Sequence, residues 1–107
     1  MIAEYIEHMG SDLSVVNSAR VSFDKESSYN SEGELSGKDV KLINYLASHN
    51  HWTPFSHPQI TIREKVPIFV ARQRFKHMIG FTYNEVSRRY VNDKPSFYKP
   101  VWRNKPE

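Results

Sequence analysis

Cysteine is absent from the sequence, and so is any long apolar run. The first absence excludes disulfide bonds, zinc–thiolate sites and a cysteine nucleophile. The second excludes a membrane-spanning helix, which needs roughly 20 consecutive apolar residues. The N-terminus also lacks the basic and apolar segments that make up a secretory signal. We therefore expect an intracellular, cytoplasmic protein without a membrane partner.

Charge is distributed unevenly along the chain. Residues 1–62 hold four Lys or Arg against eight Asp or Glu, a net charge of −4, whereas residues 63–107 hold eleven against four, a net charge of +7. A basic half is typical of a nucleic-acid surface or of a site for anionic small molecules. Because Phe81, Tyr83 and Tyr90 are interleaved with the basic residues, a small nucleic-acid-binding module without catalysis is the alternative function.

The first forty residues predict a strand, a helix and a loop. Residues 2–9 alternate partially between apolar and polar side chains, which indicates an edge strand. Ser11 and Asp12 are good N-cap residues for a helix that extends to about Arg20. Residues 25–37 are rich in Ser, Glu, Asn and Gly, so we expect a loop there.

A second helix, a turn and a strand follow in the sequence. Ser36 is expected to cap the helix at its start, and Asn50 is a C-cap candidate at its end. Pro54 and Pro58, near the two ends of residues 53–58, predict a shaped turn, and residues 59–66 alternate as a strand with one buried face does. The apolar side chains of the helix are Val40, Ile43, Leu46 and Ala47, and those of the strand are Ile60 and Ile62.

A third helix is predicted to begin at Pro67 and to stop at Gly80. Pro67 suits a first helical position, and Gly80 ends the periodic pattern. Gln73 and Lys76 are expected to project together from one face of this helix. The apolar face consists of Ile68, Ala71, Phe75 and Ile79.

Three prolines in residues 91–107 predict an irregular tail. Strands and helices without a regular βαβ rhythm indicate the α+β class, with a mixed or antiparallel sheet flanked by helices. At 107 residues we expect a single domain.

The segment after Gly80 is too polar to be core and is dense in hydrogen-bonding groups. Such a set suits a ligand with both a phosphate and a hydrogen-bonding ring. A nucleophilic role for its serine is the alternative, but a hydroxyl followed by two arginines is better placed to hold phosphate, and no activating base is evident. The residues are Asn84, Glu85, Ser87, Arg88, Arg89 and Tyr90.

These residues resemble the signature of the flavin-dependent thymidylate synthases, which reads Arg-His-Arg, a spacer, and then S-x-N-E-x-S-x-R-Y in many members. Here the triplet is Lys76-His77-Met78, and Asn84 to Tyr90 matches the second part. The preceding PIFVARQ, the segment Thr53 to His57 (TPFSH) and the segment Arg20 to Phe23 (RVSF) also resemble the family, in the same order. Lys76 and Met78 replace the two arginines of the triplet, and the spacer is one residue longer.

The resemblance implies that the chain is the N-terminal half of a larger family fold. It implies methylation of dUMP to dTMP with methylenetetrahydrofolate, FAD and NADPH, by a homotetramer. It implies contacts with FAD from Thr53, Lys76, His77, Met78 and Glu85. It implies contacts with dUMP from Gln73, Lys76, Glu85, Ser87, Arg88 and Arg89. No catalytic residue is identifiable in this half, and Thr53 is expected to lie at one cleft with Lys76–Met78.

Two further interpretations concern isolated residues. Without the resemblance, Glu85 reads as a cap or as the partner of Arg88 or Arg89 in a salt bridge, since no second carboxylate forms a catalytic pair with it. His49, His51 and His57 lie close in sequence, but a metal site needs a fixed spacing and supporting carboxylates, and His49 and His51 span an expected helix end. We therefore expect polar contacts there, and no metal site.

Overall fold

The structure is a computed structural model that describes residues 1–106. The chain packs as two compact units, which are described separately. The first consists of Ala3–Arg63, and the second of Met1–Ile2 together with the chain from Glu64 onward. None of the described helices has the length and apolar character needed to cross a membrane.

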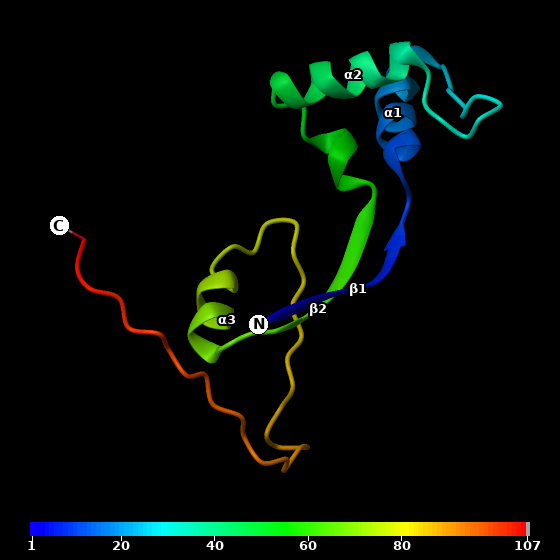
Figure 1. Cartoon of the computed structure of the whole chain (residues 1–107). Coiled ribbons are helices and arrows are strands. Elements are labelled where there is room, and N and C mark those ends of the chain that lie inside the picture. Colours follow the sequence, from blue (N-terminus) through cyan, green and yellow to red (C-terminus); the bar gives the residue numbers. More distant parts are fainter. Residues whose placement is uncertain (107) are drawn as a thin grey trace. The chain divides into compact units, whose positions relative to one another are not determined.

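The first unit begins with the strand and the helix that the sequence predicts. Strand β1 covers Ile2–Met9, and helix α1 covers Asp12–Arg20 with Ser11 as its N-cap (Figure 1). The Ser14 hydroxyl accepts a hydrogen bond from the Ser11 N–H at 3.0 Å, so two serines organise the helix start. A single 3₁₀ turn, η1 (Val21–Phe23), follows α1 and leads into the loop.

Helix α2 covers Gly37–Ser48 and also starts where the sequence predicts. The Ser36 hydroxyl accepts a hydrogen bond from the Asp39 N–H, which fixes the first turn. The helix is capped by His49 rather than by Asn50, which was the predicted C-cap. Asn50 is the next residue and has a left-handed φ of 58°, a conformation that asparagine tolerates better than most residues.

The predicted apolar face of α2 is only partly correct. Leu46 is buried, as are Val15 and Val16 of α1, which packs against α2, and these three form the buried apolar core of the described chain. Ile43 is half-buried, whereas Val40 and Ala47 are exposed. The physical reason is that α1 has nine residues and covers only part of the twelve-residue α2.

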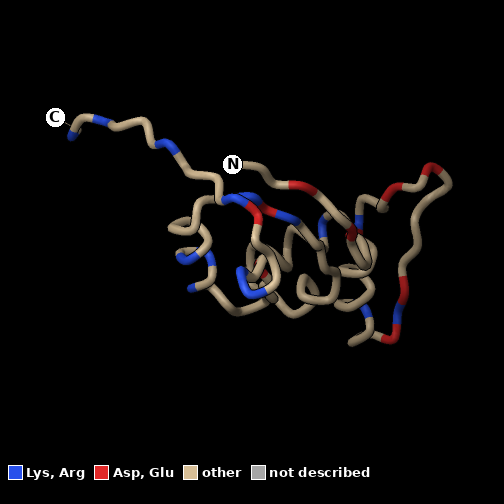
Figure 2. The backbone as a smooth tube through the Cα atoms, turned by 90° about the horizontal axis from the view of Figure 1, so that it is seen from below, with Lys and Arg blue, Asp and Glu red and all other residues tan. Residues whose placement is uncertain are grey.

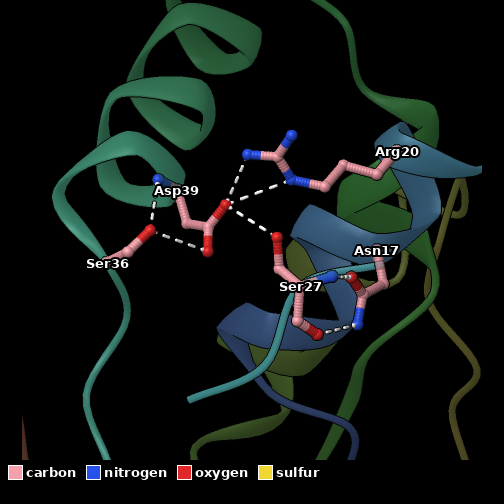
Figure 3. A network of polar contacts seen from close by, with 5 residues as sticks. All are labelled: Asn17, Arg20, Ser27, Ser36 and Asp39. Atoms are coloured by element: carbon pink, nitrogen blue, oxygen red, sulfur yellow. Dashed lines mark hydrogen bonds and ion pairs between the residues drawn. The ribbon is translucent and has the colours of Figure 1, made fainter. Parts of the chain in front are cut away.

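A polar network joins α1, the loop and α2 (Figure 3). Asp39 is 2% exposed, and one of its carboxylate oxygens accepts hydrogen bonds from Arg20 and Ser27. The Ser36 hydroxyl donates to its other oxygen at 3.0 Å. Asn17 holds the backbone of Ser27 through two further bonds. The loop is therefore tied to both helices through one buried carboxylate.

A 3₁₀ turn, η2 (Thr53–Ser56), leads into strand β2 (Gln59–Lys65), which pairs antiparallel with β1 as a two-stranded sheet (Figure 1). Helices and an antiparallel sheet confirm the α+β class. The predicted buried face of β2 is wrong: Ile60 is 71% and Ile62 is 52% exposed. The helices of the first unit pack mainly with one another and with η2, so they leave the sheet uncovered.

In the second unit, helix α3 covers only Ile68–Arg74, with Pro67 as N-cap and Phe75 as C-cap. The predicted helix is therefore too long at both ends. Pro67 precedes the first helical residue, and Lys76 and Ile79 lie beyond the last. Gly80 has a left-handed φ of 77° in a separate turn. The Lys76 and His77 N–H groups bond three residues back, to Gln73 and Arg74, so the chain tightens into turns that the apolar periodicity does not reveal.

Residues 91–106 form no helix or strand, in the region where the sequence predicts an irregular tail, and residue 107 lies outside the described residues. Figure 2 shows Lys and Arg recurring along this tail, whereas acidic residues concentrate in the loop between α1 and α2. The uneven charge of the sequence therefore corresponds to a basic tail and to an acidic loop between α1 and α2.

Candidate functional site

The segment after α3 holds most of the residues predicted to bind ligands. Lys76, His77 and Met78 leave the helix and are exposed, with Met78 at 72%. The side chains of Gln73, Lys76 and His77 make no hydrogen bond or ion pair with any other residue the structure describes. An ammonium, an imidazole and an amide are therefore available to a ligand within five residues.

Glu85 is held by an arginine that sequence reasoning did not single out. One Nη atom of Arg72 lies 2.9 and 3.2 Å from the two Glu85 carboxylate oxygens. The hydrogen bond that Arg72 donates to Glu85 raises the pKa of Arg72, with a smaller charge contribution in the same direction. The predicted salt bridge of Glu85 with Arg88 or Arg89 is wrong. Thirteen residues separate Arg72 from Glu85, and no local pattern indicates a pair at that spacing.

Ser87, Arg88 and Arg89 lie in a turn that ends with Tyr90. The Ser87 hydroxyl accepts a weak hydrogen bond from the Arg89 N–H at 3.3 Å, while the Ser87 carbonyl accepts from the Tyr90 N–H at 3.0 Å. One Nη of Arg88 donates to the Asp93 carbonyl at 2.6 Å. The Arg89 guanidinium lies 5.5 Å from the centre of the Tyr90 ring, a cation–π distance. Neither arginine forms an ion pair with a described acid.

The eight predicted site residues from Gln73 to Arg89 therefore all belong to the second unit, on α3 and the turns that follow it. Thr53, the remaining predicted FAD contact, lies in the first unit at the start of η2. Its position at one cleft with Lys76–Met78 stays a prediction.

Thr53 lines an open pocket of about 860 Å³ within the first unit. That volume is in the usual range for sites that take nucleotide-sized ligands. Its walls carry aromatic rings and a cation, a combination that suits a flat ring with an anionic group. The lining includes Arg20, Phe23, Tyr45, His51, Trp52 and His57.

Arg20 lines this pocket and is held in place by an ion pair with Asp39. Its Nη2 lies 2.6 Å from an Asp39 oxygen, and its side chain is 24% exposed. Burial raises the pKa of Asp39, but the hydrogen bonds from Arg20, Ser27 and Ser36 outweigh burial and hold the pKa below its ordinary value. Asp39 is therefore ionised near neutral pH and keeps Arg20 in place. Sequence reasoning missed Asp39, although the Ser-x-x-Asp spacing from Ser36 is a known capping signal.

His51 and His57 both line the pocket, but His49 stacks on Tyr45 with ring centres 4.0 Å apart. Among residues 1–106, no group of three His, Cys, Asp or Glu side chains is arranged to hold a metal ion. The contacts that His49 makes are the helix-end contacts that the sequence suggests for it.

Comparison with known proteins assigns the chain to a family. Residues 4–107 match the family model described as "Thymidylate synthase complementing protein", so the chain belongs to that family. It is 46% identical over 97 residues to the flavin-dependent thymidylate synthase of Thermotoga neapolitana, covering 91% of this chain and 42% of that protein. The corresponding enzyme of Streptomyces avermitilis is 38% identical over 97 residues, covering 91% and 39%.

A solved structure is also similar to this chain. It is the UMP/dUMP methylase from Streptomyces cacaoi bound with 5-Br dUMP, with a TM-score of 0.70 and 33% identity over 85% of this chain and 37% of that one. The chain thus spans about two fifths of the length of the relatives it matches. The resemblance read from the motifs is confirmed at the level of the family.

Proposed function

We propose that this chain supplies the nucleotide- and flavin-binding part of a flavin-dependent thymidylate synthase, which methylates dUMP to dTMP. The observation that carries the proposal is the cluster of exposed polar side chains on and after α3 in a chain of this family, three of which, Gln73, Lys76 and His77, make no hydrogen bond or ion pair with another described residue. Support also comes from the names of its relatives, and from a structural neighbour that was solved with a dUMP analogue.

The residues fit a nucleotide. Lys76, Arg88 and Arg89 offer positive charge, and Ser87 offers a hydroxyl, within fourteen residues. Phosphate prefers such donors, and forked guanidinium groups hold it in a fixed orientation. The Gln73 and Glu85 side chains can recognise the donors and acceptors of a uracil ring. In this proposal Gln73, Lys76, Glu85, Ser87, Arg88 and Arg89 bind dUMP.

The residues also fit a flavin. FAD supplies redox chemistry that no side chain of this protein can provide, and the protein binds and orients it. Lys76 and His77 can hydrogen-bond to the cofactor, Glu85 can accept from it, and the apolar Met78 can only pack against it or use its backbone. Thr53 stands at a pocket with aromatic walls, which suits a flat ring system.

The remaining parts of the proposal follow from family membership alone. Methylenetetrahydrofolate would be the one-carbon donor and NADPH the source of reducing equivalents. The active assembly would be a homotetramer in the cytoplasm, with the further protein segments found in the longer relatives.

Binding experiments on the purified chain test this function directly. We expect dUMP and FAD each to shift amide resonances of residues 73–90 in a two-dimensional NMR titration. A small nucleic-acid-binding module would instead bind single-stranded DNA with an affinity that falls steeply with salt. Strong binding of DNA, with no response to millimolar dUMP or FAD, would refute the proposal in favour of that alternative.

Activity is testable in a hybrid enzyme. Residues 4–107 would replace the matching segment of the Thermotoga neapolitana synthase. The hybrid would be expressed in a bacterial strain that lacks thymidylate synthase, and growth without added thymidine would be measured. We expect growth, because the family model spans this whole segment. A folded, flavin-loaded hybrid that never supports growth would contradict the proposed activity.

Replacing Ser87 by Ala separates binding from nucleophilic catalysis. If the hydroxyl only positions dUMP, the hybrid should lose about ten- to 150-fold in kcat/KM, as expected for one hydrogen bond to a charged phosphate of about 1.5–3 kcal/mol. A covalent nucleophile would be irreplaceable, and the chemical step would vanish. We expect the modest loss. Mass spectrometry that finds a dUMP adduct on Ser87 would reverse this assignment.

A further inference from the structure

The Tyr83 hydroxyl binds the backbone on both sides of Lys76. It lies 2.9 Å from the His77 carbonyl oxygen and 3.2 Å from the Arg74 carbonyl oxygen. A phenol has one proton to donate, so the two carbonyls share it. The same Arg74 carbonyl accepts the His77 N–H at 3.1 Å. The turn of residues 74–77 is therefore closed by its own hydrogen bond and fastened at both ends by one side chain.

The Tyr83 ring is itself held in place by packing. Its centre lies 4.8 Å from that of Phe75, the last residue before the turn's exposed part. It also stacks on Phe81, with ring centres 5.8 Å apart and nearly parallel planes, and Phe81 meets the His77 imidazole edge-on at 5.2 Å. Both Tyr83 and Phe75 are half-buried in otherwise exposed chain. A fixed ring gives the hydroxyl a fixed direction.

We propose that Tyr83 is a positioning residue for the nucleotide and flavin site, an inference that rests on the proposed function. It sets the backbone that carries Lys76 and His77. It also directly precedes Asn84 and Glu85, and Glu85 is bound back to α3 through Arg72. One tyrosine thus joins the two separated parts of the family signature. The signature leaves its position open, so family membership does not assign this role.

We call the two hydrogen bonds of the Tyr83 hydroxyl to the Arg74 and His77 carbonyls the Tyr83 clamp. The shortness of α3 explains why such a clamp is needed. With seven residues, α3 is too short to be stable by itself, and its last carbonyls have no helical partners. Lysine is a compact charge on a flexible stem, whereas the arginine that it replaces is a preorganised fork. A lysine reaches a phosphate reliably only if the backbone that carries it is fixed. Tyr83, which lies outside the helix, fixes this backbone through its hydroxyl.

The variant Tyr83→Phe tests the clamp, since it keeps the ring and removes only the hydroxyl. Its matched control is Tyr98→Phe, because Tyr98 packs on Phe69 but its hydroxyl bonds to no described residue. We expect amide hydrogen exchange at Lys76 and His77 to become about three- to tenfold faster in Tyr83→Phe, the size of one lost hydrogen bond. Exchange in α1 and in the control should stay as in the parent. Unchanged exchange at both amides would refute the clamp.

The positioning role needs a second readout, the dissociation constant for dUMP measured at a temperature where all variants are folded. We expect binding about three- to tenfold weaker in Tyr83→Phe and unchanged in Tyr98→Phe. Faster exchange with unaltered dUMP affinity would show a purely structural contact and overturn the proposal. If the parent binds no dUMP, the proposed site itself fails, and the exchange data still report separately on the clamp.

Discussion

Asp39→Asn is expected to destabilise the first unit by about 2–3 kcal/mol at pH 7, below the 3–5 kcal/mol typical of a fully buried pair because Arg20 keeps some solvent contact. The amide preserves the shape of the carboxylate but offers a single acceptor oxygen. It leaves the guanidinium of Arg20 without its counter-charge and one of the two serine hydroxyls without an acceptor. Urea denaturation followed by circular dichroism measures the loss.

The apolar core is small, so the loss of the polar network should have a large effect on stability. Only Val15, Val16 and Leu46 are buried apolar side chains in the described chain, so the polar network provides a large share of the tertiary order between α1 and α2. Glu32→Gln is the matched control, because it also neutralises one acid, at an exposed site in the loop between α1 and α2. Equal destabilisation by the two substitutions would show that net charge, and not the network, is responsible.

The same carboxylate predicts a pH dependence. Because the folded pKa of Asp39 is lower than its ordinary value of 3.8, the unfolded chain binds the proton more readily. The stabilisation is fully present above about pH 4, and it is lost as the pH falls through the folded pKa. We expect the parent to lose more stability than Asp39→Asn as the pH is lowered from 5 through 3.8 and below. Parallel pH profiles of the two proteins would exclude Asp39 as the source.

Local signals predicted the helix starts and the strands well. Ser11 and Ser36 mark the beginnings of α1 and α2 because their hydroxyls can satisfy the first free N–H groups. Alternation located β2 to within one residue. Alternation could not reveal that Ile60 and Ile62 are exposed, since burial depends on what packs over the sheet rather than on the strand itself.

Contacts between distant residues were beyond the reach of these signals. The apolar period continues through Phe75 and Ile79, yet α3 ends at Arg74, where the chain turns and the Tyr83 hydroxyl meets its carbonyl. A lone aspartate in a sequence is predicted to be exposed, because a buried carboxylate is costly. Three donors from separate segments offset that cost for Asp39. The candidate site itself came from the resemblance, since isolated polar residues specify no ligand.

Lys76→Ala is expected to weaken dUMP binding by roughly 1.5–3 kcal/mol, which is about ten- to 150-fold, as for a charged hydrogen bond to phosphate. The side chain has no intramolecular partner among the described residues, so its removal should leave stability nearly unchanged. Calorimetry with dUMP measures the effect. Lys99→Ala in the tail is the control for loss of one positive charge.

A comparison of dUMP with deoxyuridine identifies the part of the nucleotide that Lys76 contacts. Deoxyuridine has the same ring and sugar as dUMP but no phosphate, so Lys76→Ala should leave its weaker binding unchanged if the ammonium contacts phosphate. Lys76→Arg, which restores the family residue, should bind dUMP at least as tightly as the parent, because a guanidinium can hold two phosphate oxygens at once. If Lys76→Ala weakened deoxyuridine and dUMP equally, the lysine would contact the nucleoside, and the phosphate would have to be assigned to Arg88 or Arg89.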